Sequence, residues 1–290
     1  MKLGVSLWLW TSPITTEVIS SFAPKLAKMG YQTIEVPLDE PDLIDGSEAK
    51  KIIEDNGLAV TTCAAMGPGR DVIHPDKEVR ENGMAYLRKC IDKANELGSS
   101  TFAGPMYAEV GRCWRATDEQ HSRETDLFVD QLKALSVPAN DKGITLCIEP
   151  LNRFETSFMN LTSQALEVID RVDSPSCKML FDLFHAGIEE KSLGDAIRLA
   201  GDKIHHLQLA ENDRGTPGTG QFAWGEVASA LDDIGYDKNC VIETFSQDNE
   251  TLIAAAAIWR PLAESPDALA IDGLAFLKRL FENHLNGKPI

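Results

Sequence analysis

Residues 145–155 read TLCIEPLNRFE, a short apolar run that ends on Glu149 and continues into a polar loop. The same pattern recurs in CKMLFDLFH at 177–185, KIHHLQLAENDRG at 203–215 and NCVIETF at 239–245. Each run carries an oxygen-bearing side chain at its end: Glu149, Asp182, Gln208 and Glu243. Apolar strands favour apolar residues, so this recurrence predicts that four strand ends converge on one polar point.

Short apolar runs occur eight times along the chain, each with the length and β-rich composition of a strand. They occupy residues 3–8, 32–37, 59–66, 100–106, 145–151, 177–184, 203–211 and 239–245. Amphipathic stretches lie between them, among them 14–29, 77–97, 122–141, 162–171, 192–200 and 224–235, and another follows at 266–286. Strands joined by helices run parallel, with right-handed crossovers.

Eight such units predict an α/β fold, a closed (β/α)8 TIM barrel that takes the whole chain, 1–290, as a single domain. The alternative is an open doubly wound sheet, which usually carries a glycine-rich turn after its first strand. The corresponding segment here, SLWLWTSP at 6–13, has no glycine. In a parallel barrel the chemistry lies at the carboxyl ends of the strands, which is where the four oxygen-bearing residues fall.

The composition excludes several classes of partner. The chain has 290 residues, 43% of them hydrophobic, and a formal net charge of −17. This charge repels phosphate backbones and anionic membranes, so a neutral small molecule is expected as partner, with no nucleic acid and no membrane. No run is long enough to span a membrane, and the amino-terminal residues do not form a secretory signal. Six scattered cysteines without a CxxC pair indicate reduced thiols and a cytoplasmic location.

Three of the four strand-end residues are carboxylates, and like charges gathered at one barrel mouth repel unless a cation lies among them. Glu149, Asp182 and Glu243, with the amide oxygen of Gln208, are therefore candidate ligands for one divalent metal ion. Such an all-oxygen set suits Mg²⁺ or Mn²⁺ better than Zn²⁺, with Co²⁺ as a substitute. Taken singly, each carboxylate could equally cap a helix or pair with an arginine. His206 shares a strand face with Gln208 and is expected to be a core histidine.

With these residues in place, the chain resembles the xylose isomerase-like TIM-barrel superfamily. Within it, the chain is most similar to the ketose 3-epimerases of the D-tagatose and D-psicose type. The resemblance rests on five segments: GPMYAEVGR at 104–112, EPLNRFE at 149–155, FDLFHAGIEE at 181–190, ENDRGTPGTG at 211–220 and IGYDKNCVIETF at 234–245. These segments span most of the expected barrel in the expected order, which makes the match specific.

The resemblance implies roles for individual residues. The family's metal ligands are Glu, Asp, His and Glu at strands 5 to 8, which correspond here to Glu149, Asp182, Gln208 and Glu243. Gln208 is thus a departure, although hydroxypyruvate isomerases resemble this chain in having Gln in a similar context. The resemblance further implies that Glu149 and Glu243 transfer the substrate proton. It places His185 and Arg214 at the substrate's C2 oxygen, and Glu155 near its terminal hydroxyl.

Aromatic residues and the absence of a phosphate-binding motif further define the expected class of substrate. Trp8, Trp114 and Phe245 fall near the barrel mouth and are candidates to pack against the carbon chain of a sugar. No glycine-rich phosphate loop or cluster of Lys and Arg is evident, which favours a sugar that carries no phosphate.

The predicted function is a metal-dependent epimerase or isomerase that acts on a free ketose through an enediolate. One alternative is an aldose–ketose isomerase of a small hydroxycarbonyl such as hydroxypyruvate, which the glutamine at 208 motivates. A second alternative is a non-catalytic sugar-binding protein of the same fold. A nuclease of the apurinic type is disfavoured, since the chain has only six histidines and a strongly negative charge. The resemblance also implies a homodimer or homotetramer.

Overall fold

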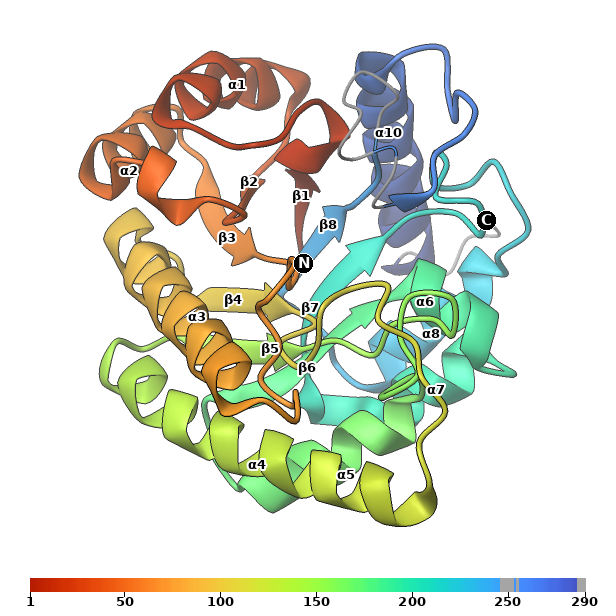
Figure 1. The fold of residues 1–290 in the computed structure, drawn as a ribbon. Coiled ribbons are helices and arrows are strands. Elements are labelled where there is room, and N and C mark those ends of the chain that lie inside the picture. The colour runs from red at the N-terminus through yellow and green to blue at the C-terminus, as the bar shows by residue number, and fades with distance from the viewer. Residues whose placement is uncertain (246–252, 254–255, 286–290) are drawn as a thin grey trace.

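The structure is a computed structural model that describes residues 1–245, 253 and 256–285. Its centre is a closed barrel of eight parallel strands in sequence order (Figure 1). The strands are β1 Lys2–Ser6, β2 Thr33–Pro37, β3 Ala59–Cys63, β4 Thr101–Gly104, β5 Thr145–Ile148, β6 Cys177–Asp182, β7 Ile204–Leu209 and β8 Asn239–Ile242. β8 pairs with β1 and closes the ring. The predicted (β/α)8 barrel is confirmed, and the open doubly wound sheet is ruled out.

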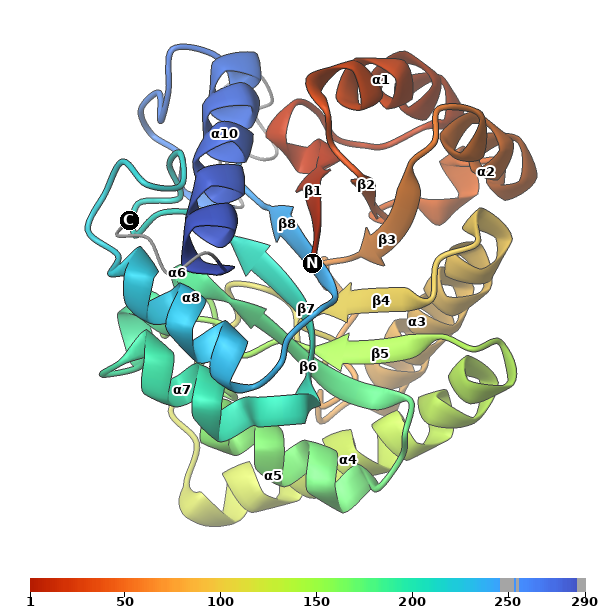
Figure 2. The ribbon, with the colours of Figure 1, turned by 180° about the vertical axis from the view of Figure 1, so that it is seen from behind.

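Helices surround the barrel in both views (Figures 1 and 2). They are α1 Thr16–Met29, α2 Gly46–Asp55, α3 Lys77–Leu97, α4 Asp118–Asp141, α5 Thr162–Val172, α6 Leu183–Glu189, α7 Leu193–Ala200, α8 Trp224–Asp233 and α10 Pro266–Leu285. Short 3-10 turns lie at Leu7–Leu9, Pro41–Leu43 and Gly201–Lys203. The predicted helices are present. α4 begins earlier than the predicted start at residue 122, and residue 286, the predicted end of the last helix, lies outside the described ranges. The structure also contains two helices, α2 and α6, that were not named from the sequence.

Local sequence explains where the helices begin. Seven of the described helices start after a side chain that accepts a backbone N–H of the first turn: Thr15, Asp45, Asp76, Thr117, Asp182, Ser192 and Ser265. Such a cap satisfies one of the amide groups that a helix leaves unpaired at its start. None of the helices in the described ranges is both long and apolar enough to be a membrane span.

The strands end earlier than the apolar runs do, and this places the polar residues at the barrel rim. β5 ends at Ile148 and β8 at Ile242, so Glu149 and Glu243 are the first residues beyond their strands. Asp182 closes β6, and its carboxylate caps α6 by accepting the N–H of Phe184 at 2.6 Å. The register pairs Asp182 with Gln208 of β7, so the two lie side by side.

The six cysteines are all unpaired, as expected from their spacing, and five of them are buried. Most of the apolar side chains pack between the strands and the helices. A smaller apolar cluster comprises Trp8, Cys63, Ala103, Cys147, Leu180, Phe245 and Ile258. It includes Phe245 from the loop after β8, so apolar packing continues from the strands to the rim.

Gly104 ends β4 in a conformation that strongly favours glycine. Its φ is +133°, and a Cβ atom there would lie 2.1 Å from the carbonyl oxygen of Ala64 at the end of β3. A side chain would therefore force apart two neighbouring strand ends beside the cavity.

We expect Gly104→Ala to destabilise the barrel more than an ordinary left-handed glycine substitution does. Gly57→Ala is the matched control, because Gly57 has φ +70° but no atom within 4 Å of its Cβ position. The control should cost about 1–2 kcal/mol of unfolding free energy, and Gly104→Ala about 1–3 kcal/mol more. Urea unfolding of the two variants measures both losses, and equal losses would contradict the close approach.

Candidate active site

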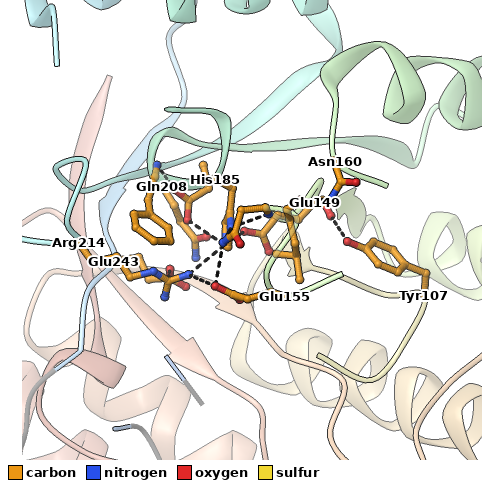
Figure 3. Close-up of polar contacts among 12 residues, drawn as sticks. Tyr107, Glu149, Glu155, Asn160, His185, Gln208, Arg214 and Glu243 are labelled. Atoms are coloured by element: carbon orange, nitrogen blue, oxygen red, sulfur yellow. Dashed lines mark hydrogen bonds and ion pairs between the residues drawn. The ribbon is translucent and has the colours of Figure 1, made fainter. Parts of the chain in front are cut away.

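A cavity of about 1360 Å³ lies at the carboxyl ends of the strands. Of the residues selected from the sequence, its lining includes Trp8, Glu149, Glu155, His185, Gln208, Arg214, Glu243 and Phe245. The side chains labelled in Figure 3 come from β7, from α6 and from the loops that follow the strands. Asp182 is buried beside Gln208, 4% exposed. The structure thus brings together the four strand-end residues.

Three buried carboxylates form the acidic centre of the cavity. Burial raises the pKa of Glu149 well above its usual value, and repulsion from Asp182 and Glu243 raises it further. Burial likewise raises the pKa of Glu243, and repulsion from Asp182 raises it further. Burial raises the pKa of Asp182 to about 6, although the Arg214 guanidinium opposes the shift. These carboxylates destabilise one another whenever they are ionised together.

The polar atoms at this centre fit a divalent cation. Glu149, Asp182 and His185 each direct a ligand-type atom to one place, with those atoms within 4.8 Å of one another. Gln208 Oε1 is buried and finds no hydrogen-bond partner within the described part of the chain. A buried carbonyl oxygen without a partner is costly, and a hard cation would satisfy it. The cluster can therefore bind a metal.

His185 has a hydrogen-bond donor next to each of its ring nitrogens. The backbone N–H of Asn152 donates to Nδ1 at 3.0 Å, and Arg214 Nη2, which can only donate, lies 3.0 Å from Nε2. Burial, and then Arg214, lower the pKa of His185 well below its usual value, which keeps the ring neutral. Nε2 lies 3.6 Å from Glu149 and 3.9 Å from Asp182.

Arg214 supplies a buried positive charge to the site. Its backbone has φ +62°, and its side chain lies between the rings of Phe184 and Phe245, at 4.3 and 4.8 Å. Nη2 lies 3.4 Å from Glu155 and 3.0 Å from His185 Nε2, and Nη1 lies 4.0 Å from Glu243. The side chains of Arg214 and His185 therefore lie together next to the carboxylates.

The loop that carries Arg214 is built on Glu211, which the sequence analysis did not select. Glu211 is fully buried, and its Oε1 accepts from Gly218 N at 2.8 Å and from Trp224 Nε1 at 2.5 Å. Its Oε2 accepts from the backbone N–H of Asn212 and, more weakly, of Phe222. The backbone N–H of Arg214 donates to Glu211 O at 2.9 Å. One carboxylate thus fixes the path of residues 211–224.

Two further residues that were not predicted from the sequence hold the end of β5. Tyr107 is fully buried, and its hydroxyl donates to the backbone oxygen of Glu149 at 3.0 Å (Figure 3). The side chain of Asn152 donates to Glu155 Oε1 at 2.9 Å, while its backbone binds His185. Both residues lie in segments that carry the family resemblance, and that resemblance is the sequence feature that could have identified them.

The aromatic residues are not equally placed. Trp8 and Phe245 line the cavity with ring centroids 5.7 Å apart, and Trp8 Nε1 donates to Asp39 at 2.9 Å. Trp114, in contrast, is not among the cavity-lining residues of the described chain. Its ring packs against the Arg112 guanidinium at 3.5 Å, and its backbone N–H binds Ser157. In this structure Trp114 therefore packs against Arg112, and its contact with a sugar stays a prediction.

His206 and Gln208 share a partner inside the barrel. Glu35 of β2 is fully buried, with Oε2 2.6 Å from His206 Nε2 and Oε1 2.9 Å from Gln208 Nε2. His206 is also fully buried, in agreement with the expected core histidine. Glu35 lies within the apolar segment TIEVP at 33–37, and the sequence analysis did not select it.

Comparison with known proteins places this geometry in a family. A family model described as "Xylose isomerase-like TIM barrel" matches residues 23–280. The chain is 30% identical over 284 residues to a probable ketose 3-epimerase of Synechocystis, covering 98% of both chains. It is 27% identical to the D-psicose 3-epimerase of Ruminiclostridium cellulolyticum, covering 98% of this chain and 99% of the relative.

Solved structures agree with these relatives. An L-ribulose 3-epimerase structure matches with a TM-score of 0.92 and 29% identity, covering 99% of this chain and 96% of that one. A Methylomonas D-allulose 3-epimerase in complex with D-allulose matches with a TM-score of 0.89 and 27% identity, covering 96% of each chain. The names of these proteins confirm the expected enzyme class, a carbohydrate epimerase or isomerase. With its closed barrel and a family model matched over most of its length, the chain belongs to the xylose isomerase-like TIM-barrel family.

Proposed function

We propose that this protein is a divalent metal-dependent epimerase that inverts C3 of a free ketose. The observation that carries the proposal is the pair Glu149 and Glu243, two buried carboxylates with raised pKa values that line one cavity together with Arg214. The relatives named ketose 3-epimerases support the same reaction over nearly the full chain. The bound D-allulose of the Methylomonas structure supports an unphosphorylated sugar as substrate.

The metal ligands in this proposal are Glu149, Asp182, Gln208 and Glu243. A divalent ion held there supplies Lewis acidity, which makes the hydrogen on the carbon beside the ketone easier to remove. The all-oxygen donor set favours Mg²⁺ or Mn²⁺, with Co²⁺ as a substitute. The partnerless Oε1 of Gln208 and the crowding of three carboxylates support this assignment.

Proton transfer falls to the two glutamates. One carboxylate takes the proton from C3 on one face of the sugar, which leaves an enediolate, and the other returns a proton on the opposite face. Glu149 follows β5 and Glu243 follows β8, so they approach the cavity from different parts of the rim (Figure 3). Burial raises the pKa of each glutamate, which favours the uptake of a proton from the substrate carbon.

The neighbouring donors stabilise the charge that develops on the substrate. The His185 ring and the Arg214 guanidinium are fixed before substrate binds, by Asn152 and by the loop built on Glu211. Preorganised donors of this kind bind an oxygen more strongly as it becomes negative. We assign them to the C2 oxygen. Glu155 is assigned to a terminal hydroxyl, and Phe245 with Trp8 to the carbon chain.

Product analysis tests this proposal. The protein loaded with Mn²⁺ is incubated with a panel of ketohexoses and ketopentoses, including D-allulose, and the sugars are separated by chromatography. The expected products are C3 epimers. Aldoses as the products would favour the aldose–ketose isomerase. Sugar binding with no product from any ketose would favour the non-catalytic binding protein.

We expect Glu149→Gln and Glu243→Gln each to lower kcat by about 10²–10⁴-fold, because each removes one proton-transfer group. Each change also removes the charge of a proposed metal ligand, so Mn²⁺ affinity should fall as well, and kcat is compared at saturating Mn²⁺. Glu81→Gln on the exposed face of α3 is the matched control. Steady-state kinetics together with Mn²⁺ titration separate the two effects. Full activity in either variant would remove that glutamate from the mechanism.

The metal-free protein should show the raised pKa of Asp182 in its stability. The folded pKa is about 6, above the usual 3.8, so protonated Asp182 stabilises the fold at low pH. This contribution is lost as the pH rises through about 6. Asp182→Asn keeps the cap of α6 and removes the charge, so it should raise the melting temperature of the metal-free protein at neutral pH.

Asp195→Asn, an exposed first-turn position of α7, is the control for this comparison. Thermal unfolding with a chelator, across acidic and neutral pH, measures the difference between the two variants. By the same reasoning, Mn²⁺ affinity of the unmodified protein should fall as the pH drops below about 6. A melting temperature that Asp182→Asn lowers at neutral pH would contradict the repulsion described here.

A further inference from the structure

Glu35 makes a charged contact with the amide of a proposed metal ligand, deep inside the barrel. It is 0% exposed, and its Oε1 accepts from Gln208 Nε2 at 2.9 Å. Its Oε2 lies 2.6 Å from His206 Nε2 and 3.4 Å from the hydroxyl of Thr61. Both oxygens of this carboxylate are therefore engaged, and the Cys63 side chain is a further hydrogen-bond neighbour of Glu35.

The barrel register leaves room for this contact. β1 lies between β2 and β8, and its residues Gly4 and Ser6 pair with Thr33 and Glu35. Partners in a parallel pair face the same side of the sheet, so the β1 residues beside Glu35 on its face are Gly4 and Ser6, which are both small. A Cβ atom on Gly4 would lie 2.9 Å from Thr33 Cβ and 3.2 Å from Val241 Cγ2. The side chains of β2 and β8 therefore pack directly over Gly4, and Glu35 reaches β7 across the barrel.

The contact determines which end of the Gln208 amide faces the site. A carboxylate oxygen only accepts hydrogen bonds, so the NH2 end of the amide must face Glu35. The opposite orientation would place the carbonyl oxygen against a carboxylate oxygen, with no hydrogen between them. Gln208 Oε1 is thereby directed away from Glu35. This oxygen is buried and has no hydrogen-bond partner in the described structure. Gln208 lines the cavity together with Glu149 and Glu243.

We propose that Glu35 is the positioning residue of the metal site, which holds the Gln208 amide so that its oxygen serves as the fourth ligand. The inference rests on the proposed function, since it assumes that a divalent ion binds at this cluster. Glu35 itself does not touch the ion or the substrate. Partners outside the ligand shell commonly change metal affinity by about 10–100-fold.

Calorimetric titration of the full chain with Mn²⁺ tests the proposal. Glu35→Gln keeps the size of the side chain but can both donate and accept, so it no longer selects one orientation of Gln208. We expect about 10–100-fold weaker Mn²⁺ binding. Thr61→Val is the matched control, because Thr61 contacts the other oxygen of the same carboxylate. Its Mn²⁺ affinity should stay within about twofold of the unmodified protein.

A double-mutant cycle shows whether Glu35 acts through Gln208. Once Gln208→Ala has removed the amide, Glu35→Gln should cause no further loss of Mn²⁺ affinity. An equal loss in both backgrounds, or an unchanged affinity after Glu35→Gln alone, would overturn the proposal. Circular dichroism and melting temperature establish that each variant folds. If Glu35→Gln does not fold, Glu35→Asp decides, because it keeps the charge beside His206 but is too short to hold the amide.

Mn²⁺ binding by the unmodified protein distinguishes failure of the proposed function from failure of the proposed role of Glu35. If it binds no divalent ion at all, the metal in the proposed function is wrong. If it binds Mn²⁺ and the Glu35 variants bind it equally well, only the role of Glu35 is wrong.

Discussion

Mutual repulsion among Glu149, Asp182 and Glu243 is the constraint around which this site is organised. All three are nearly fully buried, and their proximity contributes to the raised pKa values of the two glutamates. Arg214 opposes the repulsion with a buried charge, and its own position depends on the loop that Glu211 holds. A cation among the carboxylates would complete the compensation, and would convert an unfavourable cluster into a binding site.

Much of this arrangement could be predicted from the sequence, because it follows from local patterns. Eight apolar runs separated by amphipathic stretches predict the barrel, and the oxygen-bearing residues at their ends predict where the site lies. Contacts between distant strands were beyond this reasoning. Glu35 meets His206 and Gln208 across 171 and 173 residues of sequence, and only barrel closure brings them together. Trp114 shows the second difficulty, since the path of a long loop decides whether a side chain faces the cavity.

The structure also changes the meaning of the glutamine at 208. An imidazole offers one N–H donor and one acceptor nitrogen, and an amide offers NH2 donors and an acceptor oxygen. Glu35 uses the donor end of the amide, which leaves the acceptor for the cavity. The resemblance implies a histidine ligand at this position. Glutamine there offers a donor to Glu35, and in the proposed site it would offer the metal an oxygen instead of a nitrogen. That change favours harder cations and need not abolish the site.

The central claim is that this cavity moves a proton at C3 of a ketose. The position of solvent deuterium in the recovered sugar tests it most directly. The Mn²⁺-loaded protein is incubated with a ketose substrate in deuterated water, and the sugars are analysed by nuclear magnetic resonance. The account predicts deuterium at C3 of the product, with inverted configuration there. Deuterium at C1 or C2 with a shifted carbonyl, or no deuterium in any sugar, would contradict it.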